Sequence, residues 1–170
     1  TFWTFAMGYL AIIGFPGWAG YFSKDHIIEA AFEHSPIAGT AALIGAGITA
    51  FYMTRLMLFT FFGEKRWQPG VHPHESPRTM TVPLIVLATL SVVAGALMNG
   101  WIQHWLEPAT GAHAHEVSLI PTPIGWLTLL LVAAGVALAW WLFGTKQIPA
   151  VAHASTNPFT VMGRNDLFGD

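Results

Sequence analysis

Four long apolar runs leave this chain few ways to fold. A helix needs about 20 apolar residues to cross a bilayer, and its backbone polar groups must find partners inside the helix. Only 9% of the 170 residues are charged, whereas a soluble domain carries about 25%. We therefore predict an all-α, polytopic bundle of transmembrane helices with about four membrane crossings, embedded in a lipid bilayer. The predicted segments are residues 2–33, 37–62, 81–98 and 124–143.

The composition excludes several classes of function. The formal net charge of -2 gives no basis for nucleic-acid binding. The chain has no cysteine, so it cannot hold a disulfide, a Cys-ligated iron–sulfur cluster or a thiolate zinc site. It also has no Walker loop, glycine-rich dinucleotide turn or G-x-S-x-G motif. We expect no cofactor bound by this chain itself, and no hydrolytic chemistry.

The distribution of basic residues predicts an orientation. Residues 63–80 contain three Lys or Arg residues, whereas residues 99–122, which we expect to form a loop, contain none. Basic loops stay on the cytoplasmic side of a membrane. We therefore place the 63–80 loop and both ends of the chain in the cytoplasm. The transmembrane region then covers residues 1–143, and residues 144–170 form a cytoplasmic tail.

Prolines and small residues predict where helices start and pack. Pro83 and Pro123 fall at the starts of their helices, where a missing N–H does no harm. Gly95 is expected to let a neighbouring helix approach closely. Small residues at a spacing of four predict two further packing faces in the second run, one made of Ala38, Ala42, Ala46 and Ala50 and the other of Ala41, Gly45 and Thr49.

The first apolar run is broken in its middle. Pro16, Gly17 and Gly20 interrupt it, and the chain then continues into Lys24 and Asp25. Proline removes a helical hydrogen bond, and irregular backbone survives in a membrane only beside protein or a water-filled cavity. Ionisable groups at that depth are costly and are usually functional. The first helix is therefore predicted to break at Pro16, and the Lys-Asp pair indicates an ion or proton path.

Further carboxylates follow the break at regular intervals. Asp25, Glu29 and Glu33 are four residues apart and so share one helix face, over about 12 Å. A low-dielectric site can bring the proton affinities of a lysine and a carboxylate closer together. Lys24 and Asp25 could therefore exchange a proton, with Glu29 and Glu33 as relays towards the non-cytoplasmic surface. The alternatives are a static Lys24–Asp25 ion pair and two surface glutamates.

Two other groups of side chains are weaker candidates. Arg55, with Tyr52 near it, could line or stabilise the site, or could extend to the cytoplasmic interface. Two H-x-H-E strings occupy residues 72–75 and 113–116, and each could bind a metal ion in extended backbone. The predicted orientation places these strings on opposite sides of the membrane. We favour surface histidines and expect no metal site.

Several ordered motifs resemble one protein family. Residues 14–28, GFPGWAGYFSKDHII, resemble the proline break and Phe-Ser-Lys-Asp signature of the antiporter-like L subunits of respiratory complex I. Segments within residues 49–64 and 74–84 are similar to the next helix, loop and helix start of that family. The tail at residues 165–168 resembles the approach to the family's long lateral helix, which is absent from this chain. The resemblance implies a C-terminal portion of a larger subunit.

The same resemblance implies a function and an assembly. Lys24 would belong to the second proton half-channel of a proton-translocating NADH:quinone oxidoreductase, and Asp25 would connect it to the non-cytoplasmic side. Other membrane-arm subunits would be partners, and FMN, iron–sulfur clusters, NADH and quinone would lie in partner subunits. The location would be the bacterial plasma membrane. The large subunit of a cation/proton antiporter and a structural membrane scaffold remain alternatives.

Overall fold

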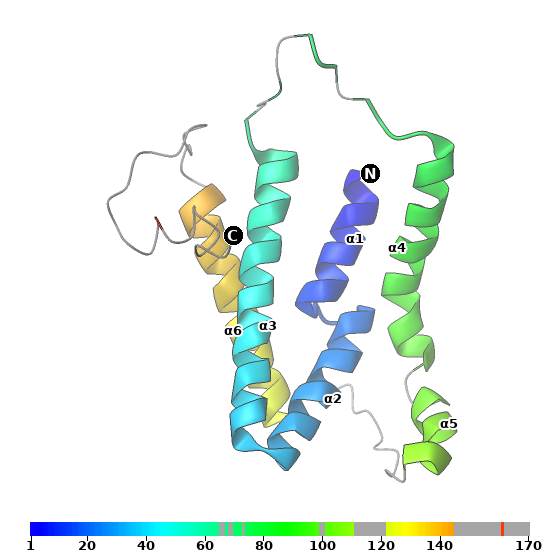
Figure 1. The fold of residues 1–170 in the computed structure, drawn as a ribbon, viewed down its shortest axis with the longest axis vertical. Coiled ribbons are helices and arrows are strands. Elements are labelled where there is room, and N and C mark those ends of the chain that lie inside the picture. The colour runs from blue at the N-terminus through cyan, green and yellow to red at the C-terminus, as the bar shows by residue number, and fades with distance from the viewer. Residues whose placement is uncertain are drawn as a thin grey trace.

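Helices make up all the regular structure in the described part of the chain, which confirms the all-α prediction (Figure 1). The computed structural model describes residues 1–64, 67, 70–72, 74–98, 101–110, 122–144 and 161. The predicted tail at 144–170 lies outside these residues, apart from two positions. The elements are α1 (Phe2–Ile13), α2 (Ala19–His34), α3 (Pro36–Met57), the π-helical turn η1 (Leu58–Phe62), α4 (Arg78–Met98), α5 (Trp101–Thr110), α6 (Pro123–Ala139) and the π-helical turn η2 (Trp140–Gly144).

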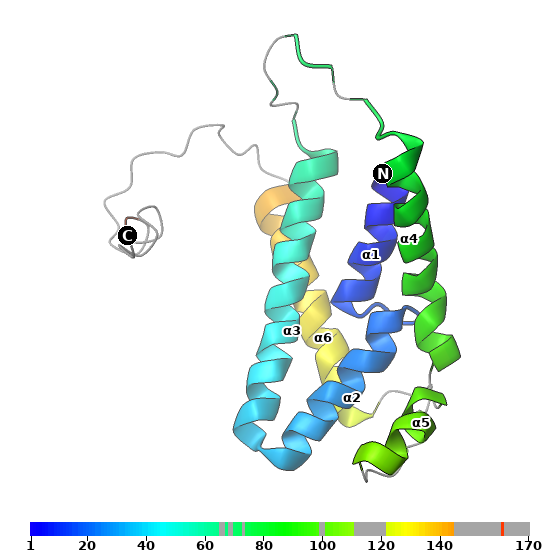
Figure 2. The same ribbon diagram turned by 45° about the vertical axis from the view of Figure 1, so that its right-hand side comes forward.

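The long helices alternate in direction. In Figure 1, α1 and α2 follow each other downwards, α3 returns upwards, α4 runs down again and α6 returns beside α3. The N-terminus, the end of α3 and the start of α4 therefore lie at one end of the bundle (Figure 2). The α2–α3 turn, α5 and the start of α6 lie at the other end. This alternation is the order that four crossings require.

Three helices in the described residues are long and apolar enough to cross a membrane. They are Pro36–Phe62, Arg78–Met98 and Pro123–Gly144, with mean hydropathies of 1.5, 2.2 and 2.1. The shorter helix α1 is also apolar, and α2 continues it after the break. Because the α1–α2 pair runs alongside the three long helices, a fourth crossing through the broken helix stays our prediction.

The third apolar run begins earlier than the sequence indicates. Helix α4 starts at Arg78, because the carbonyl of Pro77 already accepts N–H bonds from Met80 at 2.9 Å and Thr81 at 3.1 Å. Pro83 therefore lies inside the helix rather than at its start, and our placement of it was wrong. Pro123 does begin α6, as predicted.

Part of the region that we expected to be a loop is helical. Within residues 99–122, α5 covers Trp101–Thr110. Trp101, Trp105 and Leu106 recur at helical spacing and leave large apolar surfaces exposed. A short helix of this kind suits the plane of a membrane interface. The expectation of a simple loop was wrong, because a helix of 10 residues is too short to give the signal of a membrane crossing.

Close packing between α3 and α6 forms the largest contact in the bundle. Of the first predicted small-residue face on α3, Ala46 and Ala50 are buried, whereas Ala42 is partly buried and Ala38 is exposed. On α6, a Cβ atom at Gly135 would lie 2.5 Å from the carbonyl oxygen of Gly47. The second predicted face does not pack in this way, since Gly45 has no heavy atom within 4 Å of its Cβ position.

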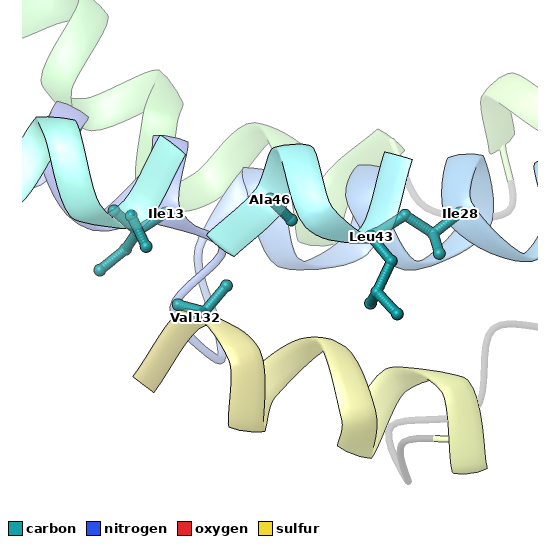
Figure 3. Packing of buried hydrophobic residues seen from close by; sticks show 6 residues of the cluster. Ile13, Ile28, Leu43, Ala46 and Val132 are labelled. Atoms are coloured by element: carbon teal, nitrogen blue, oxygen red, sulfur yellow. The ribbon is translucent and has the colours of Figure 1, made fainter. Parts of the chain in front are cut away.

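The core forms where four helices meet. Ile13 ends α1, Ile28 belongs to α2, and Leu43 with Ala46 projects from α3, while Val132 faces them from α6 (Figure 3). This cluster lies directly beside the helix break, because Ile13 is the last residue before it. The packing therefore fixes the position of the half-helix ends.

The tight approach of α4 to α2 was also predicted correctly. A Cβ atom at Gly95 would lie 2.4 Å from the Cα atom of Ala19, the first residue of α2. Side chains larger than hydrogen are therefore excluded at this contact. Helix α4 otherwise buries little of its surface within the described residues.

We expect Gly135→Ala to destabilise the fold, because the new methyl group would press on the backbone of α3. Overpacking of this kind costs about 1–3 kcal/mol. Gly45→Ala is the matched control, since the same methyl group would enter open space and alanine favours a helix. Thermal unfolding of the full-length protein in detergent should give a lower midpoint for Gly135→Ala alone. Equal midpoints for the two variants would contradict the close α3–α6 contact.

Candidate functional site

The first helix ends in a glycine-based cap, which confirms the predicted break. Gly14 is left-handed, with a φ of 81°. Its N–H bonds the carbonyl of Ala11 at 3.1 Å, and the N–H of Phe15 bonds the carbonyl of Leu10 at 2.9 Å. This pair of bonds is a Schellman motif, which satisfies two of the carbonyls that a helix end leaves open. Helix α2 then begins at Ala19.

A third carbonyl at the end of α1 accepts a hydrogen bond from the Lys24 side chain. Its ammonium group, Nζ, donates a hydrogen bond to the carbonyl oxygen of Ile12, in the last turn of α1. On its way the half-buried side chain passes Gly14, where a Cβ atom would lie 3.5 Å from Lys24 Cδ. A cation is stabilised by the negative end of a helix dipole. Lys24 therefore reaches back across the break and caps α1.

The two half-helices touch through their backbones. A Cβ atom at Gly20, in the first turn of α2, would lie 1.8 Å from the carbonyl oxygen of Ala11. Only glycine fits such a contact. The carbonyl end of α1 and the N–H end of α2 therefore lie close together. Discontinuous helices with opposed ends of this kind form ion and substrate sites in transporters.

Lys24 and Asp25 are not joined in the structure, although we expected them to form a pair. No ion pair or hydrogen bond links their side chains among the described residues. Successive helical residues point about 100° apart, and Lys24 is already directed towards Ile12. The ionisable neighbours that act electrostatically on half-buried Asp25 are Glu29 and His26.

The carboxylate stripe becomes more exposed along α2. Asp25 and Glu29 are half-buried, whereas Glu33 is exposed near the end of the helix. The carboxylate of Glu29 accepts a hydrogen bond from the hydroxyl of Thr122. Thr122 is the N-cap residue of α6 and was not identified from the sequence. The structure therefore places a half-buried carboxylate between the break and the helix end.

Tyr52 and Arg55 lie on the outer face of α3. Tyr52 is 46% exposed. The guanidinium carbon of the exposed Arg55 lies 5.0 Å from the ring centroid of Phe59 and 5.3 Å from that of Phe143. Such stacking on aromatic faces stabilises a cation. No hydrogen bond or ion pair joins either residue to Lys24 or Asp25 in the described residues.

A cavity of about 580 Å³ runs along α1 on its α4 side. Its lining extends from Thr4, near the start of α1, to Ile12 and Gly20 at the break. The lining is mostly apolar and includes the residues Tyr9 and Ser91. The cavity therefore extends along α1 from the N-terminal end of the bundle to residues at the helix break.

A buried hydrogen bond adjoins this cavity. The hydroxyl of Thr54, which is 3% exposed, donates to the carbonyl of Ala50 at 2.6 Å. The hydroxyl of Tyr9 lies 2.9 Å from the hydroxyl oxygen of Thr54. Tyr9 must donate this bond, because the single hydroxyl proton of Thr54 already points at Ala50. The bond joins α1 to α3. No pattern in the sequence pairs these two residues.

His26 is a further residue that was not singled out from the sequence. Its Nε2 atom is buried and has no hydrogen-bond partner among the described residues. It directly follows Asp25 in the sequence. Its position within the Lys-Asp motif was the signal available in the sequence.

The candidate metal strings give no cluster in the described residues. There, no group of three or more His, Cys, Asp or Glu side chains could hold a metal ion. His72, His74 and Glu75 lie exposed in the link between η1 and α4. The second string, at 113–116, lies outside the described residues.

Comparisons with known proteins give consistent relatives, although no protein-family model matches the chain. NADH-quinone oxidoreductase subunit L of Mycobacterium tuberculosis strain CDC 1551 is 52% identical over 177 aligned positions, covering 100% of this chain and 28% of the relative. Subunit L of Neisseria meningitidis serogroup B is 30% identical, covering 100% and 31%. NADH-ubiquinone oxidoreductase chain 5 of Lumbricus terrestris is 32% identical, covering 84% and 23%. The chain thus spans less than a third of these relatives.

We expect Gly14→Ala to destabilise the break, because alanine resists the left-handed conformation by about 1–2 kcal/mol. Space is not limiting, since the nearest atom to the new Cβ is 3.5 Å away. Gly14→Asn should cost less, because asparagine adopts this conformation more readily. Gly8→Ala, in open space within α1, is the control. The measurement is chemical unfolding of the full-length protein in micelles, followed by tryptophan fluorescence. The free energy of unfolding should be lowest for Gly14→Ala, higher for Gly14→Asn and highest for Gly8→Ala. A Gly14→Ala variant as stable as Gly8→Ala would show that the cap does not form.

Proposed function

Because the chain belongs to the subunit L family of NADH-quinone oxidoreductases, we propose that its helix break forms a proton half-channel in the membrane arm of a proton-translocating complex. Lys24 is the proton carrier, and Asp25 is the next acceptor. Glu29 and Glu33 lead outwards along α2. The single observation that carries this proposal is the hydrogen bond from the Lys24 ammonium group to the Ile12 carbonyl.

This hydrogen bond couples charge to structure. With its proton, Lys24 is a cation at the negative end of α1 and has three N–H donors. Without it, the amine carries no charge, and the attraction to the helix end is lost. The proton on Lys24 therefore helps to hold α1 against the first turn of α2. A movement of either half-helix would in turn change how strongly Lys24 holds its proton.

The surroundings supply two routes to the break. The cavity along α1 reaches Ile12 and Gly20 from the predicted cytoplasmic end. The carboxylates on α2 continue from Asp25 towards the opposite end of the bundle. Lys24 lies between these routes, since it starts on α2 and its ammonium group contacts α1. A carrier in this position can receive a proton from one side and release it to the other.

Electron transfer belongs to other subunits in this proposal. The names of the relatives specify NADH and a quinone, and FMN, iron–sulfur clusters, NADH and quinone would be bound by partner subunits of complex I. This chain contributes proton movement alone. Other membrane-arm subunits and lipid would cover its exposed apolar faces, in the plasma membrane of a bacterium. Tyr52 and Arg55 would stabilise α3 at the cytoplasmic interface.

A structural role for Lys24 is the second candidate. The same hydrogen bond to Ile12 is what a permanent helix cap would form. In that case the positive charge is needed, but its loss and gain are not. The large subunit of a cation/proton antiporter would use the same site without NADH, and the names of the relatives give it no support.

The variant Lys24→Arg distinguishes a proton-carrying role of Lys24 from a purely structural role as a helix cap. Arginine keeps a positive charge and can donate to the Ile12 carbonyl, but it does not release its proton in proteins. We expect the full-length variant to assemble and its proton-pumping rate to fall by about tenfold or more, as for loss of a positioned acid–base group, so that the proton yield per NADH oxidised falls too. The measurement is NADH oxidation together with acidification of inverted membrane vesicles, with assembly checked on native gels.

Lys24→Met is the matched variant that loses both properties. We expect the same fall in proton yield together with a lower thermal stability of the complex. A Lys24→Arg complex with a normal proton yield would overturn the carrier role. Combined with an unstable Lys24→Met complex, that result would establish Lys24 as a structural cap.

A further inference from the structure

One hydrogen bond connects the carboxylate stripe of α2 to the start of α6. The hydroxyl of Thr122 donates to the carboxylate oxygen Oε1 of Glu29. The same hydroxyl oxygen accepts the backbone N–H of Gly125 at 3.1 Å, which makes Thr122 the N-cap of α6. The two residues are 93 positions apart in the chain. The hydroxyl of Thr122 therefore has two partners, and only one of them serves the helix cap.

The cap fixes the direction of the Thr122 hydroxyl. A hydroxyl has one proton and two lone pairs. Because one lone pair is taken by the N–H of Gly125, the oxygen is held at the first turn of α6, and its proton is free to point at Glu29. The positive end of the α6 dipole favours a carboxylate at the same place. Glu29 is therefore held in one position.

The anchor of this bond is itself rigid. Helix α6 packs against α3 through Gly135, whose Cβ position would collide with the Gly47 carbonyl. Glu29 is half-buried, and Thr122 is exposed. The bond thus lies at an exposed end of the bundle, on a helix that is packed closely against α3. The Thr122–Glu29 bond can therefore hold the flexible Glu29 side chain in place near the outer end of the proposed proton path.

We propose that Thr122 is a positioning residue that holds Glu29 as the proton acceptor next after Asp25. This inference rests on the proposed function. Glu29 lies one helical turn beyond Asp25, about 6 Å along the axis. An intervening water molecule accepts the proton from the carboxyl group of Asp25 and gives one of its own protons to the carboxylate of Glu29, so the water is unchanged overall. Without Thr122, the Glu29 side chain loses its fixed rotamer and meets this proton less often.

Substitutions at Thr122 separate its two hydrogen bonds. Thr122→Asp keeps the cap, because aspartate is a strong N-cap acceptor, but an ionised carboxylate has no proton to donate. Thr122→Gly removes both side-chain bonds without adding charge, and it keeps the start of α6 because glycine is about as favourable as threonine at an N-cap. Thr122→Ser keeps both bonds. We expect the first two to lower proton yield per NADH by about three- to tenfold, and serine to keep it. The assay is the vesicle assay described for Lys24.

A Glu29→Gln background tests whether Thr122 acts through Glu29. We expect Glu29→Gln to lower proton yield and Thr122→Asp to add nothing further in the double variant, because coupled residues are not additive. A purely structural cap would leave Thr122→Asp and Thr122→Gly normal. Either that result or an additive double variant would overturn the inference.

The outcomes also separate this inference from the proposed function. A lower proton yield for Lys24→Arg with a normal yield for Thr122→Asp would sink the role of Thr122 and leave the half-channel intact. A normal yield for Lys24→Arg would overturn the half-channel itself, and the positioning role with it.

Discussion

The carbonyl groups at the end of α1 that have no partner within the helix determine how the chain is arranged at the break. A helix that stops among apolar neighbours cannot pass these groups to water, so the chain must satisfy them itself. The Schellman motif at Gly14 satisfies two of them, and Lys24 satisfies that of Ile12. The position of the lysine, the left-handed glycine and the contact at Gly20 all follow from this one requirement.

Much of the fold could be predicted from the sequence, because its strongest signals are local. Apolar run length gave the helices, Pro16 gave the break, and small-residue spacing gave the Ala46 and Ala50 face. The start of α4 was missed because the carbonyl of Pro77 can begin a helix before the apolar run does. Helix α5 was missed because its apolar stretch is too short to signal a crossing.

The site was less predictable, because its contacts join distant parts of the chain. Periodicity places Lys24 beside Asp25, but the direction of the lysine depends on where α1 ends in space. Thr122 is 93 residues from Glu29, and no motif links them. The sequence did not decide whether Arg55 lines the site or extends to the cytoplasmic interface. Its aromatic partner Phe143 comes from η2, far along the chain. Tertiary packing supplies each of these relations.

The backbone contact at Gly20 has a mechanical consequence. Two helices that meet through side chains can slide or tilt, because the side chains between them can change rotamer. A backbone carbonyl in direct contact with a glycine has no side chain between the two backbones that could adjust in this way. The contact between Ala11 and Gly20 is therefore a stiff joint. A tilt of α1 is therefore transmitted directly to the first turn of α2, and Lys24, which follows on the next turn, moves with it.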